Sequence, residues 1–151
     1  MPVGAGGPPP VIGIRPGQIL TDRLALEVTV RDGEIVSDVA RDILKVAVPG
    51  RHNDRGEVGH GLVKGFGVVR GAIASSIGHD GHNVCVIGCT DQDMAVAVNR
   101  LIELRGGFTA AVDGAVVSEP ALSIAGLMSD QPFETVEQGQ RALRAAVRGL
   151  G

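Results

Sequence analysis

The chain has 151 residues, of which 44% are hydrophobic, and this length and composition are typical of one globular domain with a single core. Its formal net charge is -3 and only 2% of its residues are aromatic, so it lacks the basic surface and the stacking side chains of nucleic-acid-binding proteins. No apolar run reaches the roughly 18 residues of a membrane span, and residues 1–10 lack the pattern of a signal peptide. We therefore expect a cytoplasmic protein without nucleic-acid or membrane partners.

The amino-terminal half is predicted to consist of short strands. Residues 1–10 are rich in glycine and proline, which predicts a disordered leader or linker, so the folded domain is expected to span residues 11–151. The Asp32-Gly33 dipeptide favours a hairpin turn between two strands, and a polar, glycine-rich loop is expected at residues 50–60. Apolar alternation and short apolar runs predict strands at residues 11–14, 18–20, 24–31, 34–36, 43–48, 61–66, 71–77 and 83–88.

Two helices are predicted in the carboxy-terminal half. Across residues 91–104 the apolar side chains recur at the spacing of one buried face, Thr90 can cap the amino end, and Gly106-Gly107 can end the helix. The second helix is expected to begin near residues 130–132 and to end by Gly149.

Between these helices, an Asp113-Gly114 turn predicts a second hairpin, with strands at residues 108–112 and 115–117. Many short strands with two separated helices favour an α+β fold, a single domain of several short, mainly antiparallel strands and two principal helices. Cys85 and Cys89 fall on one predicted strand with their Cα atoms about 13 Å apart, so we expect two small buried thiols and no disulfide between them.

All four histidines of the chain fall between residues 52 and 82, in a glycine-rich segment. The motif HDGHN at residues 79–83 places two imidazoles and a carboxylate within five residues, and these are ligand types of zinc, manganese and iron. Two interpretations stay open. The motif could bind a metal together with residues such as His52, Asp54 and His60, or His79 and Asp80 could hydrogen-bond each other or cap a turn.

The two serines that precede this motif do not form a serine-hydrolase site. Residues 74–78 supply only the trailing glycine of a nucleophile elbow, and Ser75 and Ser76 should point to opposite sides of a strand. Lys64 lies between glycines without the spacing of a phosphate-binding loop, which leaves a substrate contact open to it.

Seven segments in fixed order are informative when taken together. They are PGQILT at 16–21, RH at 51–52, GLVKGFG at 61–67, RGAIASS at 70–76, HDGHN at 79–83, DQDM at 91–94 and AGLMSD at 125–130. Together they resemble the carboxy-terminal domain of prokaryotic adenine deaminases, which are enzymes of the amidohydrolase superfamily. The resemblance covers nearly the whole chain from residue 11 to residue 148.

The resemblance implies an enzyme that hydrolyses adenine to hypoxanthine and ammonia, with manganese or iron bound in an amidohydrolase barrel upstream of this domain. Such a barrel needs about 250 residues, and its usual His-x-His metal pair occurs nowhere in this chain. We therefore expect no cofactor on this chain alone, and we expect that the chain alone does not deaminate adenine.

In this interpretation the histidine motif closes over the purine site of a separate or missing barrel, with His79 and Asp80 assisting catalysis. The candidate substrate-binding residues are His52, Lys64, Ser75, Ser76, His82 and Asn83. The expected partners are adenine or a related purine, a barrel, and a second copy of the chain through an exposed apolar docking patch. Two alternatives stay open: a non-catalytic purine-binding or protein-interaction module, and an independent metal hydrolase built on the four histidines.

Overall fold

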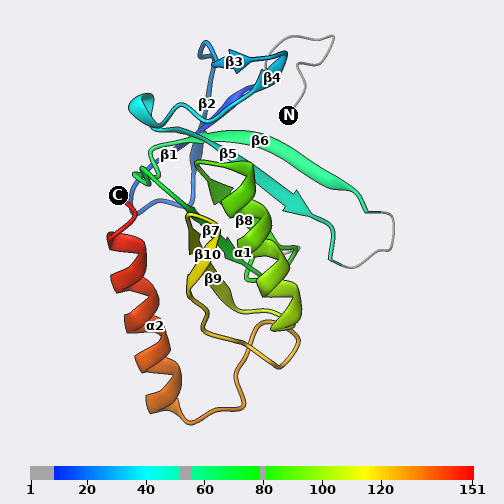
Figure 1. The fold of residues 1–151 in the computed structure, drawn as a ribbon, viewed down its shortest axis with the longest axis vertical. Helices are drawn as coiled ribbons and strands as arrows, with labels where there is room; N and C mark the ends of the chain where they lie inside the picture. The colour runs from blue at the N-terminus through cyan, green and yellow to red at the C-terminus, as the bar shows by residue number, and fades with distance from the viewer. Residues whose placement is uncertain (1–8, 52–55, 79–80) are drawn as a thin grey trace.

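The computed structural model describes residues 9–51, 56–78 and 81–151, and its centre is one mixed β-sheet (Figure 1). The strands are β1 (Val11–Ile14), β2 (Thr21–Leu24), β3 (Val30–Arg31), β4 (Glu34–Ile35), β5 (Ile43–Pro49), β6 (Val58–Lys64), β7 (Ala72–Ser75), β8 (Cys85–Gly88), β9 (Phe108–Val112) and β10 (Ala115–Ser118). The helices are the short 3-10 helix η1 (Val39–Arg41), α1 (Asp91–Glu103) and α2 (Phe133–Arg148).

Eight of these strands form the sheet in the order β10-β9-β7-β8-β5-β6-β1-β2, and β3 and β4 form a separate hairpin. All neighbouring strands of the sheet run antiparallel except β1 and β6, which run parallel. The predicted α+β class with mainly antiparallel strands is therefore confirmed. None of the helices in the described part of the chain has the length and apolar character needed to cross a membrane.

Helix α1 covers one face of the central strands. Its buried Met94, Ala97 and Leu101 pack against small side chains of β7, β8 and β9, and a Cβ added at Gly88 would lie 2.5 Å from the Met94 Cγ. Thr90 caps the helix as predicted, because its Oγ1 accepts a hydrogen bond of 3.1 Å from the Asp93 backbone N. The small side chains allow close approach of helix and sheet, and this brings the carboxy end of α1 against the strand ends.

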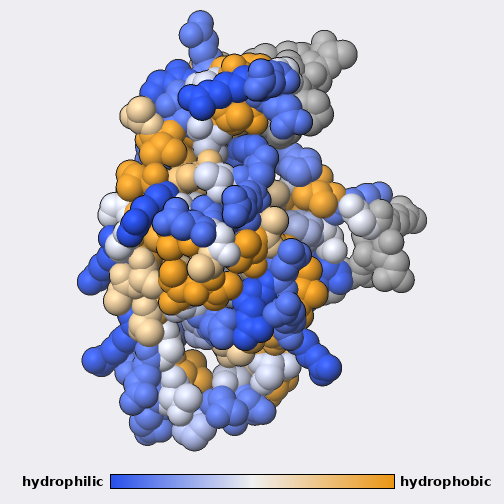
Figure 2. Space-filling model, in the orientation of Figure 1, coloured by the Kyte–Doolittle hydropathy of each residue, from blue (hydrophilic) through white to orange (hydrophobic). Residues whose placement is uncertain are grey.

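Helix α2 packs against the opposite face, near β9 and β10. Its buried Leu143 belongs to a cluster with Leu44, Val63 and Ala110, whereas the next residue of β9, Ala111, faces α1. This alternation is the two-residue period of a strand that is covered on both sides. Apolar side chains remain exposed between α1 and α2, over β10, as Figure 2 shows.

Both predicted hairpin turns are confirmed. Asp32 and Gly33 have φ values of 52° and 79°, and Asp113 and Gly114 have φ values of 53° and 77°. Positive φ at both central residues is the requirement of the type I′ turn, which explains the Asp-Gly sequence at each. The second turn is tied to α1, because the Gly114 backbone N donates a 2.8 Å hydrogen bond to the Asp93 carboxylate.

The strand predicted at residues 18–20 is wrong, and the one predicted at residues 24–31 is a strand only at its two ends. The chain instead pairs Thr21 with Ile14 and leaves the sheet after Leu24, and pairing resumes only at β3. The apolar residues of this stretch are half-buried against the cluster of Val11, Ile35, Ile43 and Leu62 without strand pairing. Their alternation therefore reflects burial on one side, which an irregular segment can also produce.

The predicted loop at residues 50–60 is also too long. Strand β6 begins at Val58 and pairs with Pro49, so the β5–β6 ladder continues three residues into the expected loop. The strand then ends at Lys64, because Gly65 and Gly67 adopt positive φ values of 94° and 76°. Phe66, which we predicted as the last residue of the strand at 61–66, therefore lies outside β6.

Candidate functional site

The chain gathers several predicted site residues at one end of the sheet. Strand β8 runs antiparallel to both β5 and β7, so the carboxy ends of β5 and β7 lie beside the start of β8. We call Arg51, Ser76, His82 and Asn83, which stand at these three ends, the strand-end cluster. His52, His79 and Asp80 lie outside the described residues, and their assigned roles stay predictions.

Asn83 connects two of these strand ends. Its Oδ1 accepts a hydrogen bond of 3.1 Å from the backbone N of Arg51, so the segment that enters β8 is tied to the segment that leaves β5. An amide oxygen used in this way serves the local structure.

Ser76 is fully buried, with 0% of its surface exposed. Its Oγ donates to the Gly126 carbonyl oxygen at 2.5 Å and accepts from the Gly107 backbone N at 2.8 Å. Ser75 is half-buried on the other side of the strand, as predicted, and its Oγ accepts from the Ile77 backbone N at 3.0 Å. Ser76 therefore fastens two loops together in the described structure, and its hydroxyl hydrogen is already used.

We expect Ser76→Ala to lower the free energy of unfolding by about 1–3 kcal/mol, because it leaves the buried Gly107 N–H and the Gly126 carbonyl without their hydroxyl partner. The adjacent Ser75→Ala is the matched control and should change the unfolding free energy by less than about 0.5 kcal/mol. Urea unfolding followed by circular dichroism measures both. Equal values for the two variants would contradict the fastening role of Ser76.

The Arg51 side chain holds the loop that follows β10. Its Nη2 donates to the Ala125 carbonyl oxygen at 2.6 Å and lies 3.5 Å from the Arg105 carbonyl oxygen at the end of α1. A Cβ at Gly126 would lie 2.4 Å from the same nitrogen, so glycine is required for this approach. We did not predict this role from the sequence, although Arg51 and residues 125–126 both belong to the segments that carry the family resemblance.

His82 has an unusual environment. Its Nδ1 is buried and has no hydrogen-bond partner in the described part of the chain, and its backbone has a φ of 44°. Buried polar atoms are nearly always paired, and a residue other than glycine rarely adopts positive φ. Both features are unfavourable for folding. Of the four residues in the cluster, His82 is therefore the one whose conformation is least explained by a contribution to stability.

Lys64 does not join the cluster. It pairs with Ile43 at the opposite end of β5, about 20 Å from the Pro49 end along the strand. Its Nζ donates to the Arg41 carbonyl oxygen. The structure thus separates Lys64 from Ser75, Ser76, His82 and Asn83, and one small purine cannot contact all five residues.

His60 also lies apart, on β6 opposite Ala47. It lines a small pocket of about 140 Å³ together with Lys45 and Asp91, which form an ion pair. In the described residues no three histidine, cysteine, aspartate or glutamate side chains come close enough to hold a metal ion. The described donor set therefore does not fit a manganese or iron centre.

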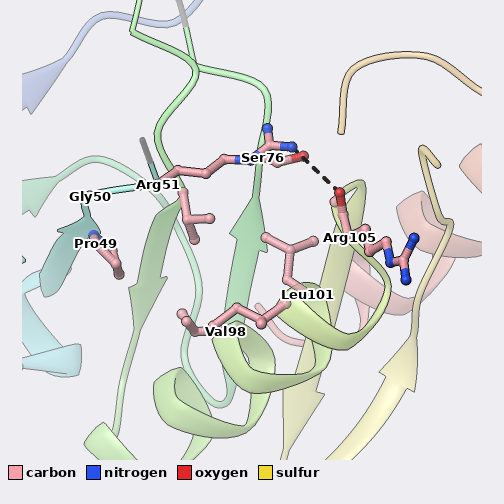
Figure 3. A pocket seen from close by; sticks show the side chains of 10 residues that line it. Pro49, Gly50, Arg51, Ser76, Val98, Leu101 and Arg105 are labelled. Atoms are coloured by element: carbon pink, nitrogen blue, oxygen red, sulfur yellow. Dashed lines mark hydrogen bonds between the residues drawn. The ribbon is translucent and has the colours of Figure 1, made fainter. Parts of the chain in front are cut away.

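A larger pocket adjoins the strand-end cluster (Figure 3). Its volume is about 400 Å³, within the range of small-ligand sites. The pocket lies between the end of β5, the start of β8 and the carboxy end of α1, and Val98 and Leu101 form part of its apolar wall. Arg51 and Ser76 stand beside it, so the bonds that fasten the loops also shape the pocket.

The two cysteines contribute no reactive group. Cys85 and Cys89 are both free, as predicted, and burial raises the pKa of each thiol. A raised pKa keeps a thiol protonated near neutral pH, and the protonated form is a poor nucleophile and metal ligand. The chemistry of this end of the sheet thus rests on its histidine, amide and guanidinium groups.

Fold and site together define a small α+β domain in which Arg51, Ser76, His82 and Asn83 gather at one end of a sheet. The sequence from residue 18 to residue 151 matches the family model described as the adenine deaminase C-terminal domain. The chain belongs to this family.

Curated relatives agree with this assignment. An adenine deaminase of Methylobacterium sp. (strain 4-46) is 55% identical over 147 residues, which cover 97% of this chain and 26% of that protein. An adenine deaminase of Methylobacterium nodulans is 52% identical over 151 residues, and adenine deaminase 1 of Rhizobium johnstonii is 50% identical over 147 residues. The chain spans about a quarter of the length of each of these three relatives, 26% in every case.

Proposed function

We propose that residues 11–151 act as the carboxy-terminal domain of an adenine deaminase and that the strand-end cluster covers the purine site of an amidohydrolase barrel. The reaction is the hydrolysis of adenine to hypoxanthine and ammonia. In this proposal His82 and Asn83 contact the purine, and His79 and Asp80 assist proton transfer. His52 and Ser75 are further candidate contacts, whereas Lys64 would contact a different part of the assembly.

The observation that carries the proposal is the buried Nδ1 of His82, which has no hydrogen-bond partner among the residues that the structure describes. A buried nitrogen without a partner costs about 1–3 kcal/mol. That cost is removed if a ligand supplies the missing hydrogen bond when the barrel closes against this end of the sheet. Adenine offers both ring-nitrogen acceptors and an exocyclic amino donor, so it can pair with either tautomer of an imidazole.

The metal belongs to the barrel in this proposal. Manganese or iron would activate the attacking water there. The residues of the described chain bind and orient the purine and exclude water from it. A cytoplasmic location and self-association of the complete enzyme are further parts of the proposal.

The first test is an adenine-to-hypoxanthine assay on the purified chain with added manganese or iron, together with elemental analysis for bound metal. We expect no turnover and no stoichiometric metal, because the His-x-His metal pair of the barrel does not occur in this chain. Turnover with metal bound would overturn the proposal and would favour an independent hydrolase built on the four histidines.

The second test joins this chain to the remaining part of a longer relative. In a chimera, this chain replaces the matching 147 residues of the Methylobacterium sp. (strain 4-46) relative. We expect the chimera to deaminate adenine within about tenfold of the parent, since 55% identity over 147 residues preserves the fold. The parent with these residues deleted is the control, and equal activity of the deletion variant and the chimera would contradict a role of this domain at the active site.

A further inference from the structure

The 400 Å³ pocket beside the strand-end cluster has the character of a protein-docking site. Its walls come from Pro49, Val84, Val98 and Leu101, and Ile102 lies at its rim with 62% of its surface exposed. The other large hydrophobic side chains that are exposed in the described chain line no part of this pocket. An apolar cavity beside an exposed isoleucine is the arrangement in which interfaces bury an anchoring side chain.

Several polar atoms around the pocket are already engaged. The Ser76 hydroxyl bonds to Gly107 and Gly126, and the Arg51 Nη2 donates to the Ala125 carbonyl oxygen. The Asn83 Oδ1 accepts from the Arg51 backbone N. A purine needs several donors and acceptors matched to its edge, and the engaged atoms supply none of them. The pocket therefore suits an apolar side chain better than a purine.

The charge at the pocket favours an acidic partner. Arg51 and Arg105 both line it, and neither forms an ion pair with a carboxylate in the described residues. The Arg105 side chain points away from Leu101 and Arg51 in Figure 3, toward the outside of the pocket. A carboxylate on the partner surface would be complementary to these guanidinium groups.

We propose that this pocket receives an apolar or aromatic side chain, flanked by a carboxylate, from the barrel part of the same polypeptide. The inference rests on the proposed function and extends it by naming the surface that docks. The matched relatives support this occupant, because this chain covers only 26% of their length and about three quarters of each lies outside it. Docking at the pocket would place the barrel directly beside His82 and Asn83.

Hydrogen–deuterium exchange tests the proposal on the isolated 151-residue chain and on the chimera. We expect amides of residues 98–106 to exchange roughly tenfold more slowly in the chimera, because docking buries this end of α1. Ile102→Lys should abolish that difference. Lysine preserves helix propensity and suits the carboxy end of a helix, so this variant should fold normally, and a melting curve of the isolated variant verifies it.

Ile19→Lys is the matched control, because Ile19 is 96% exposed and does not line the pocket. It should leave the slow exchange of residues 98–106 in the chimera unchanged. Equal exchange of residues 98–106 in the chimera and the isolated chain would overturn the inference. Slower exchange of these residues on adding adenine to the isolated chain would also overturn it, because the pocket would then be a purine site.

The two proposals fail in different ways. An inactive chimera with protected residues 98–106 supports docking at the pocket and contradicts the proposed function. An active chimera with unprotected residues 98–106 supports the proposed function and contradicts docking at the pocket.

Discussion

Replacing Gly106 with alanine is expected to lower the free energy of unfolding by more than about 3 kcal/mol, the largest effect we predict for a single substitution. Two physical causes add. Gly106 has a φ of 126°, a conformation that side chains rarely adopt, and a Cβ there would lie 2.3 Å from the Gly126 Cα. The Gly126 Cα is a backbone atom, so no rotamer change can relieve this clash. Two loops that now touch would have to separate.

Gly17→Ala is the matched control for this prediction. Gly17 has a φ of 74°, and a Cβ there would meet nothing within 4 Å. Its cost should be about 1–2 kcal/mol, from the backbone conformation alone. Chemical unfolding of the two variants measures the difference, and equal destabilisation would contradict the close approach of residues 106 and 126.

The local sequence predicts most of the elements correctly because their signals are local. The Asp-Gly turns, the Thr90 cap and the apolar periodicity of α1 each act within a few residues. The stretch at residues 24–31 shows the limit of this reasoning. Its alternating side chains do face a core, but whether a strand pairs depends on a neighbour that local sequence does not identify.

The site illustrates the same limit over longer distances. Lys64 and Ser76 are only twelve positions apart in sequence, yet the sheet places them toward opposite ends of the strands. The contacts of Arg51 with Ala125 and of Ser76 with Gly126 join residues separated by 74 and 50 positions. Such contacts depend on the strand order, which the local sequence does not reveal. The clustering of histidines in the sequence therefore indicated the region of the site but not the hydrogen bonds that hold its loops together.

The strand-end cluster contains two kinds of residue, those that hold the loops in place and one that does not. Arg51, Ser76 and Asn83 have their polar atoms bonded to backbone groups and hold the loops in place. His82 has a positive φ and a buried nitrogen that lacks a partner among the described residues, so we expect it to contribute little to the stability of the isolated chain. A residue with an unpaired buried atom or an unfavourable backbone conformation, in surroundings that are otherwise fully hydrogen-bonded, is expected at a functional site. Stability and activity should therefore respond in opposite ways to substitution of His82.

We expect His82→Asn to leave the unfolding free energy of the isolated chain unchanged or slightly raised. Asparagine tolerates positive φ better than most residues, and the substitution removes the buried unpaired nitrogen of the imidazole. In the chimera the same change should lower kcat/KM for adenine by about 10- to 100-fold, which corresponds to the loss of one hydrogen bond to the substrate.

His60→Asn is the matched control for this comparison, because His60 is exposed on β6 and lies outside the strand-end cluster. It should leave kcat/KM within about twofold of the unmodified chimera, since it removes no proposed substrate contact. A loss of stability in His82→Asn comparable to its loss of activity would show that the imidazole only shapes its loop. Retained stability with reduced activity is the result that a substrate contact of His82 predicts.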